Sequence, residues 1–307
     1  MRALVTGATG FIGRRLVGEL DRPVILSRRP EEARKILGAA EVHAWNPEES
    51  PPPAESFEGV EAIFHLAGDS VASGRWTAAK KARIRRSRVQ GTANLVEGLR
   101  NLQSRTRVLV SASAVGYYGS RGDEVLEETS APGSDFLSEV SVAWEAEAGR
   151  ARELGLRVVT VRNGMVLGAG GGALARMLLP FKLGLGGRLG DGRHWVPWVH
   201  LDDVMGLMLD AAKSEINASA SLSIWDGPMN AVAPEPVTNQ EFTRTLARVL
   251  HRPAIFPVPR LALAILFGEL SSLLLASQRV VPRVAEKSGY KFRFTSLEEA
   301  LRQSVRG

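Results

Sequence analysis

The chain has 307 residues, enough for one large domain with a sizeable core and a smaller appended part. It contains no cysteine, which excludes disulfides, thiolate nucleophiles and cysteine-based metal sites; its five histidines show no pair at ligand spacing, so we expect no metal site. The net charge of +6 makes nucleic acid a partner to consider. The first strand begins at once and no apolar span is continuous, so we expect a cytoplasmic protein that does not interact with membranes.

A glycine-rich turn joins the first predicted strand, residues 2–6, to a predicted amphipathic helix. Gly7 permits the tight turn, Gly10 lets backbone N–H groups approach a pyrophosphate, and Gly13 lets the helix pack closely on the strand. A phosphate would then lie at the positive end of the helix. Glycine-rich loops also occur for turn geometry alone, but the strand–turn–helix context favours a dinucleotide site. The predicted cofactor-binding residues of this turn are Gly7, Thr9, Gly10, Phe11, Ile12 and Gly13.

The second predicted strand, residues 24–27, ends where the ribose of a dinucleotide would be recognised. An NAD enzyme places a carboxylate there, about twenty residues after the first glycine, to bind the ribose 2′-OH. This chain places Arg28 and Arg29 after Ser27. Guanidinium groups suit a 2′-phosphate, which a carboxylate would repel. The alternative is a pair of arginines on a solvated loop. We expect NADP(H) as the cofactor, with Ser27, Arg28 and Arg29 at the 2′-phosphate.

Further strands are predicted over residues 41–45, 62–66, 108–112 and 157–162, with helices between most of them. This alternation predicts an α/β fold, a doubly wound parallel sheet covered by helices on both faces. Arg162, at the end of the last of these strands, is added to the expected cofactor-binding residues.

The densest run of positive charge falls on a helix predicted from Thr77 to about Leu99. Its alanines and aliphatic residues recur at helical spacing, and no aromatic residues interleave with its cations. We therefore expect this helix to face solvent or a second subunit, which makes a homodimer the candidate assembly, and we expect no nucleic-acid partner. The cations are Lys80, Lys81, Arg83, Arg85 and Arg86.

Shorter elements follow a glycine-rich run over residues 168–192, which encloses a helix predicted at 174–183. Asp202 is predicted to cap a helix through Ala212, residues 222–225 to form a strand, and Thr238 with Glu241 to open a helix. The apolar stretch 261–276 is predicted to be a buried or interface helix. The domain prediction is a dinucleotide-binding domain of residues 1–168, with 198–228 returning to it, and a smaller, mostly helical substrate-side lobe of residues 169–197 and 229–307.

These motifs resemble the short-chain dehydrogenase/reductase superfamily in its extended or atypical, epimerase-like branch. The glycine turn resembles its cofactor loop, residues 65–68 resemble the stretch along the adenosine, and residues 111–119 resemble the strand end that carries the active-site serine. Residues 195–200, 239–243 and 268–282 resemble an epimerase-family subgroup with its own C-terminal domain. The resemblance covers nearly the whole chain. It implies a Rossmann-like fold with cofactor contacts from Leu66, Ala67 and Gly68.

Ordinary members of that superfamily pair the serine with Tyr-x-x-x-Lys, in which the lysine lowers the pKa of the tyrosine that donates the proton. This chain lacks the pair: residues 132–141 offer neither tyrosine nor lysine. We expect Ser113 to orient the substrate oxygen and Tyr117 or Tyr118 to donate the proton. Further candidates for proton transfer are Asp135, Ser138 and Glu139.

Several functions therefore stay open. The first is an NADPH-dependent reductase of a small or medium carbonyl compound, with a nucleotide-sugar epimerase or dehydratase as a variant. The second is a catalytically inactive NADP(H) sensor, and the third is an interaction protein that only retains the fold. Trp195, Trp198 and His200 are predicted to wall a substrate pocket, the alternative being ordinary core side chains.

Overall fold

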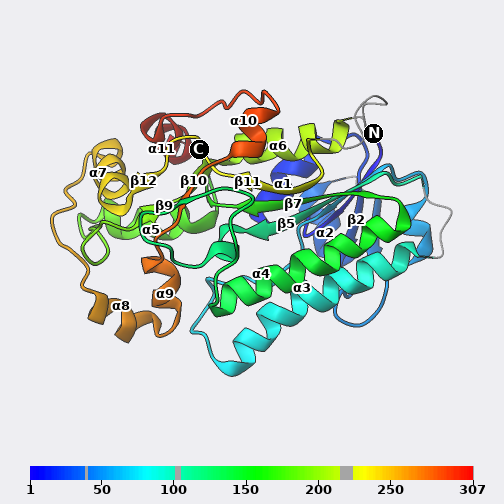
Figure 1. The fold of residues 1–307 in the computed structure, drawn as a ribbon, viewed down its shortest axis with the longest axis horizontal. Helices are drawn as coiled ribbons and strands as arrows, with labels where there is room; N and C mark the ends of the chain where they lie inside the picture. The colour runs from blue at the N-terminus through cyan, green and yellow to red at the C-terminus, as the bar shows by residue number, and fades with distance from the viewer. Residues whose placement is uncertain (39–40, 101–104, 215–223, 307) are drawn as a thin grey trace.

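The computed structural model describes residues 1–38, 41–100, 105–214 and 224–306. Figure 1 shows a central sheet with helices on both faces and a smaller, mostly helical region at one end. All neighbouring strands of the sheet are parallel, which confirms the doubly wound α/β prediction. In spatial order the strands are β11 (Gly227–Ala231), β7 (Arg157–Asn163), β5 (Val108–Ala114), β4 (Ala62–His65), β1 (Ala3–Thr6), β2 (Val24–Ser27) and β3 (Glu41–Ala44).

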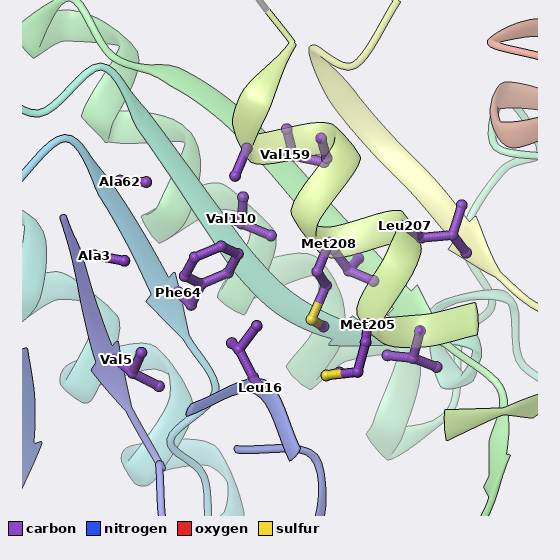
Figure 2. Packing of buried hydrophobic residues seen from close by; sticks show 14 of the residues in the cluster. Ala3, Val5, Leu16, Ala62, Phe64, Val110, Val159, Met205, Leu207 and Met208 are labelled. Atoms are coloured by element: carbon purple, nitrogen blue, oxygen red, sulfur yellow. The ribbon is translucent and has the colours of Figure 1, made fainter. Parts of the chain in front are cut away.

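Successive residues of the buried strands point to opposite faces of the sheet. Val5 and Phe64 belong to the core that Figure 2 shows, together with Met205 of the covering helix. Leu4 and Ile63, one residue earlier in each strand, belong to the core on the other face. The first face is covered by α1 (Phe11–Val17), α2 (Pro30–Leu37) and α6 (Leu201–Lys213), and the second by α3 (Ala78–Leu99) and α4 (Phe136–Gly149).

The C-terminal region has a core of its own, built around Trp198, Phe242 and Leu301. Its helices are α5 (Gly172–Lys182), α7 (Asn239–Leu250), α8 (Arg260–Phe267), α9 (Leu270–Leu275), α10 (Arg283–Lys287) and α11 (Leu297–Arg306). Three two-stranded pairs lie outside the main sheet and join segments that are distant in the sequence: β8 (Met165–Leu167) with β10 (Trp198–His200), β9 (Trp195–Val196) with β12 (Val237–Thr238), and β6 (Val125–Leu126) with β13 (Arg279–Val280). Three short 3-10 helices complete the chain: η1 (Ala54–Phe57), η2 (Val115–Tyr118) and η3 (Arg150–Leu154).

Several details of the sequence prediction need correction. The predicted strand 222–225 lies partly outside the described residues, and the strand that joins the sheet is β11, which runs past the predicted domain boundary at residue 228. The N-cap of α6 is His200 and not Asp202. The stretch 261–276 forms two helices because Gly268 adopts a φ of +60°, and most of α8 is exposed. The predicted capping box of Thr238 and Glu241 is confirmed.

No helix among the described residues is long and apolar enough to cross a bilayer. The same part of the chain holds no group of three or more histidines or carboxylates arranged to bind a metal ion.

Candidate functional site

A cavity of about 360 Å³ lies at the carboxyl ends of β1, β2 and β4. This is the edge at which open parallel sheets bind ligands. The glycine turn, the end of β2 and the end of β4 meet here, although they are far apart in the sequence. The cavity is lined by Thr6, Gly7, Ala8, Thr9, Gly10, Ile25, Leu26, Ser27, Arg28, Arg29, Glu32, Ala33, Trp45, Pro47, Glu48, Leu66, Ala67, Gly68, Asp69, Arg83 and Ser87.

Two glycines of the turn leave no room for a side chain. Gly7 has a φ of +68°, and a Cβ on it would approach the Leu66 carbonyl to 2.7 Å. A Cβ on Gly13 would lie 2.3 Å from the Gly7 oxygen, so this glycine lets α1 pack against the turn. Gly10 is the N-cap of α1 and has no side chain to occupy the helix end. At Gly10 the turn therefore leaves the N-terminal N–H groups of α1 open to a pyrophosphate.

His65 is a residue of this site whose role the sequence prediction missed. It is fully buried and lies between Thr6 Oγ1, 2.8 Å from its Nδ1, and Thr92 Oγ1, 2.9 Å from its Nε2. Thr6 Oγ1 already accepts hydrogen bonds from the N–H groups of Leu66 and Ala67, so its own hydrogen goes to Nδ1. The imidazole is therefore neutral with its hydrogen on Nε2. Through Thr6 it holds the Leu66–Ala67 backbone at the cavity wall.

Acidification is expected to destabilise the protein through His65. Burial lowers the pKa of His65 from 6.5 to about 4, so between these values the unfolded chain binds the proton that the folded chain excludes. The contribution of His65 to the free energy of unfolding is present above the unfolded pKa of 6.5 and is lost as the pH falls below it. We expect the free energy of unfolding to fall by about 2 kcal/mol between pH 7.5 and pH 5. Urea unfolding of the wild type and of His65→Gln at both values measures this contribution. His251→Gln, which removes an exposed imidazole, is the control; an equal pH slope in His65→Gln and wild type would contradict the prediction.

Arg28 and Arg29 both line the cavity beyond β2. The Arg29 side chain is 73% exposed and its Nη1 lies 2.7 Å from Glu32 Oε2. Arg28 has no side-chain partner in the part of the chain that the structure describes. The carboxylates nearby are already paired, Glu32 with Arg29 and Glu48 with Arg86 at 2.5 Å. The wall next to β2 therefore offers one guanidinium without an internal partner and a second in an exposed, readily exchanged ion pair.

A second polar cluster lies at the carboxyl ends of β5 and β7. Ser113 Oγ donates a 2.6 Å hydrogen bond to Glu145 Oε1. Arg162 binds the same carboxylate with two hydrogen bonds of 2.8 Å, from Nε to Oε1 and from Nη2 to Oε2. The side chains of Arg162 and Glu145 are 3% and 13% exposed, so this ion pair is screened little by water. It fixes the carboxylate, and the carboxylate fixes the Ser113 hydroxyl.

The two candidate proton donors differ in how they are held. Tyr118 is fully buried; its hydroxyl donates to Asn230 Oδ1 at 2.7 Å and accepts from Arg162 Nη1 at 3.0 Å. Burial raises the pKa of Tyr118 to about 12. Tyr117 is partly exposed, and its ring lies 3.5 Å from the Arg162 guanidinium carbon. Tyr117 is therefore the phenol of this pair that is left with access to a ligand.

The remaining predicted site residues lie elsewhere. Phe11 fills the space beside Gly168, Gly171 and Gly172, and Ile12 and Gly13 belong to α1 behind the turn, so these three do not line the cavity. Arg162 also lies outside the cavity lining, bound to Glu145.

The predicted pocket of tryptophan and histidine is not formed as a unit. Trp198 is 1% exposed in the C-terminal core and donates to the Glu235 carbonyl. His200 is buried against Phe294, with ring centroids 3.9 Å apart, and burial lowers its pKa. Trp195 is partly exposed, and its Nε1 donates to Asp123 at 2.7 Å. Trp198 and His200 are therefore buried side chains, which is the alternative that the sequence analysis left open for them.

Glu145 is the main residue of the polar cluster that the sequence prediction did not assign. It lies on α4, shortly after the stretch 132–141 in which the Tyr-x-x-x-Lys pair is missing. Its place on this helix was the available signal. Of the other candidates, Asp135 is the N-cap of α4 and accepts from Ser138, so both residues serve the helix end.

The cations of α3 are largely engaged in internal contacts. Lys80 is buried and lies 2.8 Å from Asp69, Arg83 lies 3.4 Å from the same carboxylate, and Lys81 pairs with Glu269. Arg88 is stacked on Trp144 and donates to the Asp69 carbonyl. The charge of this helix is therefore used mainly within the molecule.

We accordingly expect no specific affinity for DNA. Fluorescence anisotropy with a labelled random duplex should show no submicromolar binding. Charge reversal at Arg85 and Arg86 should leave the measured DNA affinity unchanged. Tight binding that weakens steeply with salt and is lost in Arg85→Glu/Arg86→Glu would contradict this expectation.

Comparison with known proteins agrees with this architecture. Residues 3–221 match the model of the NAD dependent epimerase/dehydratase family, and residues 258–304 match a domain of unknown function, DUF1731. The chain is 39% identical over 308 residues to the chloroplastic epimerase family protein SDR39U1 homolog of Arabidopsis thaliana, covering 98% of this chain and 86% of that protein. It is 37% identical over 311 residues to the epimerase family protein YfhF of Bacillus subtilis, covering 99% and 98%.

A crystal structure of the human epimerase family protein SDR39U1 with NADPH superposes with a TM-score of 0.86 at 31% identity and covers both chains completely. The chain therefore belongs to the NAD-dependent epimerase/dehydratase family of the short-chain dehydrogenase/reductase superfamily, whose nicotinamide dinucleotide-binding fold it shares.

Proposed function

We propose that the protein is an NADP(H)-dependent oxidoreductase that reduces a small or medium carbonyl compound. The observation that carries the cofactor assignment is the pair Arg28 and Arg29 on the cavity wall where an NAD enzyme would present a carboxylate to the ribose. The bare glycine turn fits the pyrophosphate, and Leu66 to Gly68 form the wall for the adenosine. The NADPH in the crystal structure of the human relative supports the same choice.

NADPH is expected to bind more tightly than NADH. Arg28→Ala should weaken NADPH binding by roughly ten- to a hundredfold, the effect of one lost charge-assisted contact, and NADH binding much less. Isothermal titration calorimetry with both nucleotides measures the difference. Arg22→Ala, which removes a guanidinium that is 90% exposed, is the matched control. Equal affinities of the wild type for NADPH and NADH would sink the assignment.

The polar cluster supplies the groups for the reaction. A bound nicotinamide would supply the hydride to the carbonyl carbon, and the protein must then protonate the oxygen. Tyr117 is assigned as the donor, because the Tyr118 hydroxyl is used in bonds to Asn230 and Arg162. The Ser113 hydroxyl donates to Glu145 in the structure; the same O–H, turned toward a bound substrate, would donate to the carbonyl oxygen and orient it for protonation.

The test is a screen of carbonyl compounds that follows loss of NADPH absorbance. The wild type and Tyr118→Phe should turn over the same compound, although Tyr118→Phe loses the buried hydrogen bonds of the Tyr118 hydroxyl. Tyr117→Phe should be impaired at the proton-transfer step. If Tyr117→Phe is as active as the wild type, the proton comes from another group or from water.

An NADP(H) sensor is the second candidate function. It is favoured by one observation: residues 132–141, where ordinary members have tyrosine and lysine, contain neither. If no compound is turned over while NADPH binds tightly, this function replaces the reductase.

A further inference from the structure

An exposed apolar surface covers the end of the molecule that is formed by the C-terminal half of α5, the loop after it, the segment 251–259 and α8. We call it the apolar patch. It holds nine of the fourteen large hydrophobic side chains that are exposed in the described part of the chain, with exposures of 39–75%. They are Leu179, Leu183, Leu185, Ile255, Phe256, Leu261, Ile265, Leu266 and Phe267.

Backbone contacts join the parts of the patch. The segment 251–259 runs beside the loop after α5: the Val258 N–H donates to the Arg188 carbonyl at 2.8 Å, and the Gly190 N–H donates to the Val258 carbonyl at 2.9 Å. Arg252 Nε donates to the Lys182 carbonyl at 2.9 Å. Helix α8 follows directly at Arg260. Figure 1 shows α8 at the lower left of the molecule, away from the central sheet.

Helix α8 is apolar around its circumference, yet Leu263 is its one buried residue. A helix that is hydrophobic on all sides is ordinarily covered, by protein or by lipid. Contiguous exposed apolar surface of this kind marks an interaction site on a folded protein. The composition of α8 therefore indicates that another surface packs on this helix, and the described part of the chain does not supply one.

The patch is also strongly basic. The two stretches that form it, residues 176–193 and 251–267, contain six arginines and lysines and a single carboxylate, Asp191. All six cations are exposed. They are Arg176, Lys182, Arg188, Arg193, Arg252 and Arg260.

The positive charge of the apolar patch distinguishes between the possible binding partners. In a symmetric dimer each copy would present the same patch to the other, and like charges would face each other. An anionic lipid surface complements both properties at once, since aliphatic and phenylalanine side chains enter the acyl boundary while arginine and lysine contact the phosphates. We propose that the protein docks reversibly on anionic membrane surfaces through the apolar patch. This docking requires no membrane-spanning helix and is independent of the proposed reductase function. It departs from the sequence-based expectation of no membrane interaction, which considered only membrane-spanning segments.

The test is co-sedimentation of the full-length protein with vesicles. Binding is expected to phosphatidylcholine vesicles that contain phosphatidylglycerol, weakly or not at all to pure phosphatidylcholine, and to decrease as salt is added. Replacing Lys182 and Arg188 by glutamine should lower the affinity about 25-fold, at about fivefold for each cation. Leu261→Glu/Ile265→Glu should abolish binding. The matched control is Ile36→Glu/Val142→Glu, which changes two apolar side chains of 44% and 40% exposure elsewhere on the surface.

Each patch variant should keep the NADPH affinity of the wild type, which shows that the fold is intact. Failure of the wild type to bind anionic vesicles at low salt overturns the proposal. So does lipid binding that the patch variants retain. If Leu261→Glu/Ile265→Glu instead converts a lipid-free dimer to a monomer in light scattering, the patch is a subunit interface and the proposal is wrong.

Discussion

Ser113→Ala is expected to lower kcat/KM for the carbonyl substrate by about 10²- to 10³-fold, the effect of losing one hydrogen-bond donor to the developing oxyanion, without weakening NADPH binding. Glu145→Gln should lower kcat/KM nearly as much, because Glu145, itself fixed by Arg162, holds the Ser113 side chain in place through the 2.6 Å hydrogen bond. The double variant should be little worse than either single one, since the two residues act as a unit. Steady-state kinetics of all three variants, with NADPH affinity measured alongside, checks the expectation.

Glu147→Gln is the matched control, because Glu147 lies on the same helix and pairs with Arg150 at the surface. Ser113→Thr, which keeps a hydroxyl, tests whether the group itself is needed. Effects that multiply in the double variant would show that Ser113 and Glu145 act independently. Full activity in Ser113→Ala would remove the serine from the reaction.

Arg162→Met is expected to destabilise the fold by roughly 3–5 kcal/mol, the cost of leaving a buried charge without its partner. The Glu145 carboxylate would lose both of its guanidinium bonds, and the Tyr118 hydroxyl and Glu128 carbonyl would each lose a donor. Urea unfolding monitored by tryptophan fluorescence gives the free energy of unfolding.

Two further variants give this prediction its contrast. Arg150→Met breaks the exposed Arg150–Glu147 pair and should cost less than about 1 kcal/mol. Arg162→Met combined with Glu145→Leu should recover part of the loss, because the second change removes the unpaired charge. A loss in Arg162→Met no larger than in Arg150→Met would contradict the view that this buried ion pair anchors the cluster.

Local sequence determined much of the fold. The glycine turn between a strand and a helix, the alternation of strands and helices, and the capping box at Thr238 are each set by residues within a few positions of one another. These features follow from backbone conformation and local hydrogen bonding, which do not need distant partners. The same holds for the position of Arg28 and Arg29, which follow from the length of one strand and one helix.

The polar cluster was decided by tertiary structure. Ser113, Glu145 and Arg162 come from β5, α4 and β7, and only the packing of α4 across neighbouring strands brings their side chains within hydrogen-bonding distance. Burial was decided in the same way. Trp198 and the leucine, isoleucine and phenylalanine residues of α8 are all large and hydrophobic, yet Trp198 lies in a core while most of α8 is exposed. The physical reason is that burial depends on which surfaces meet in the folded chain, and hydrophobicity along the sequence does not specify the partner.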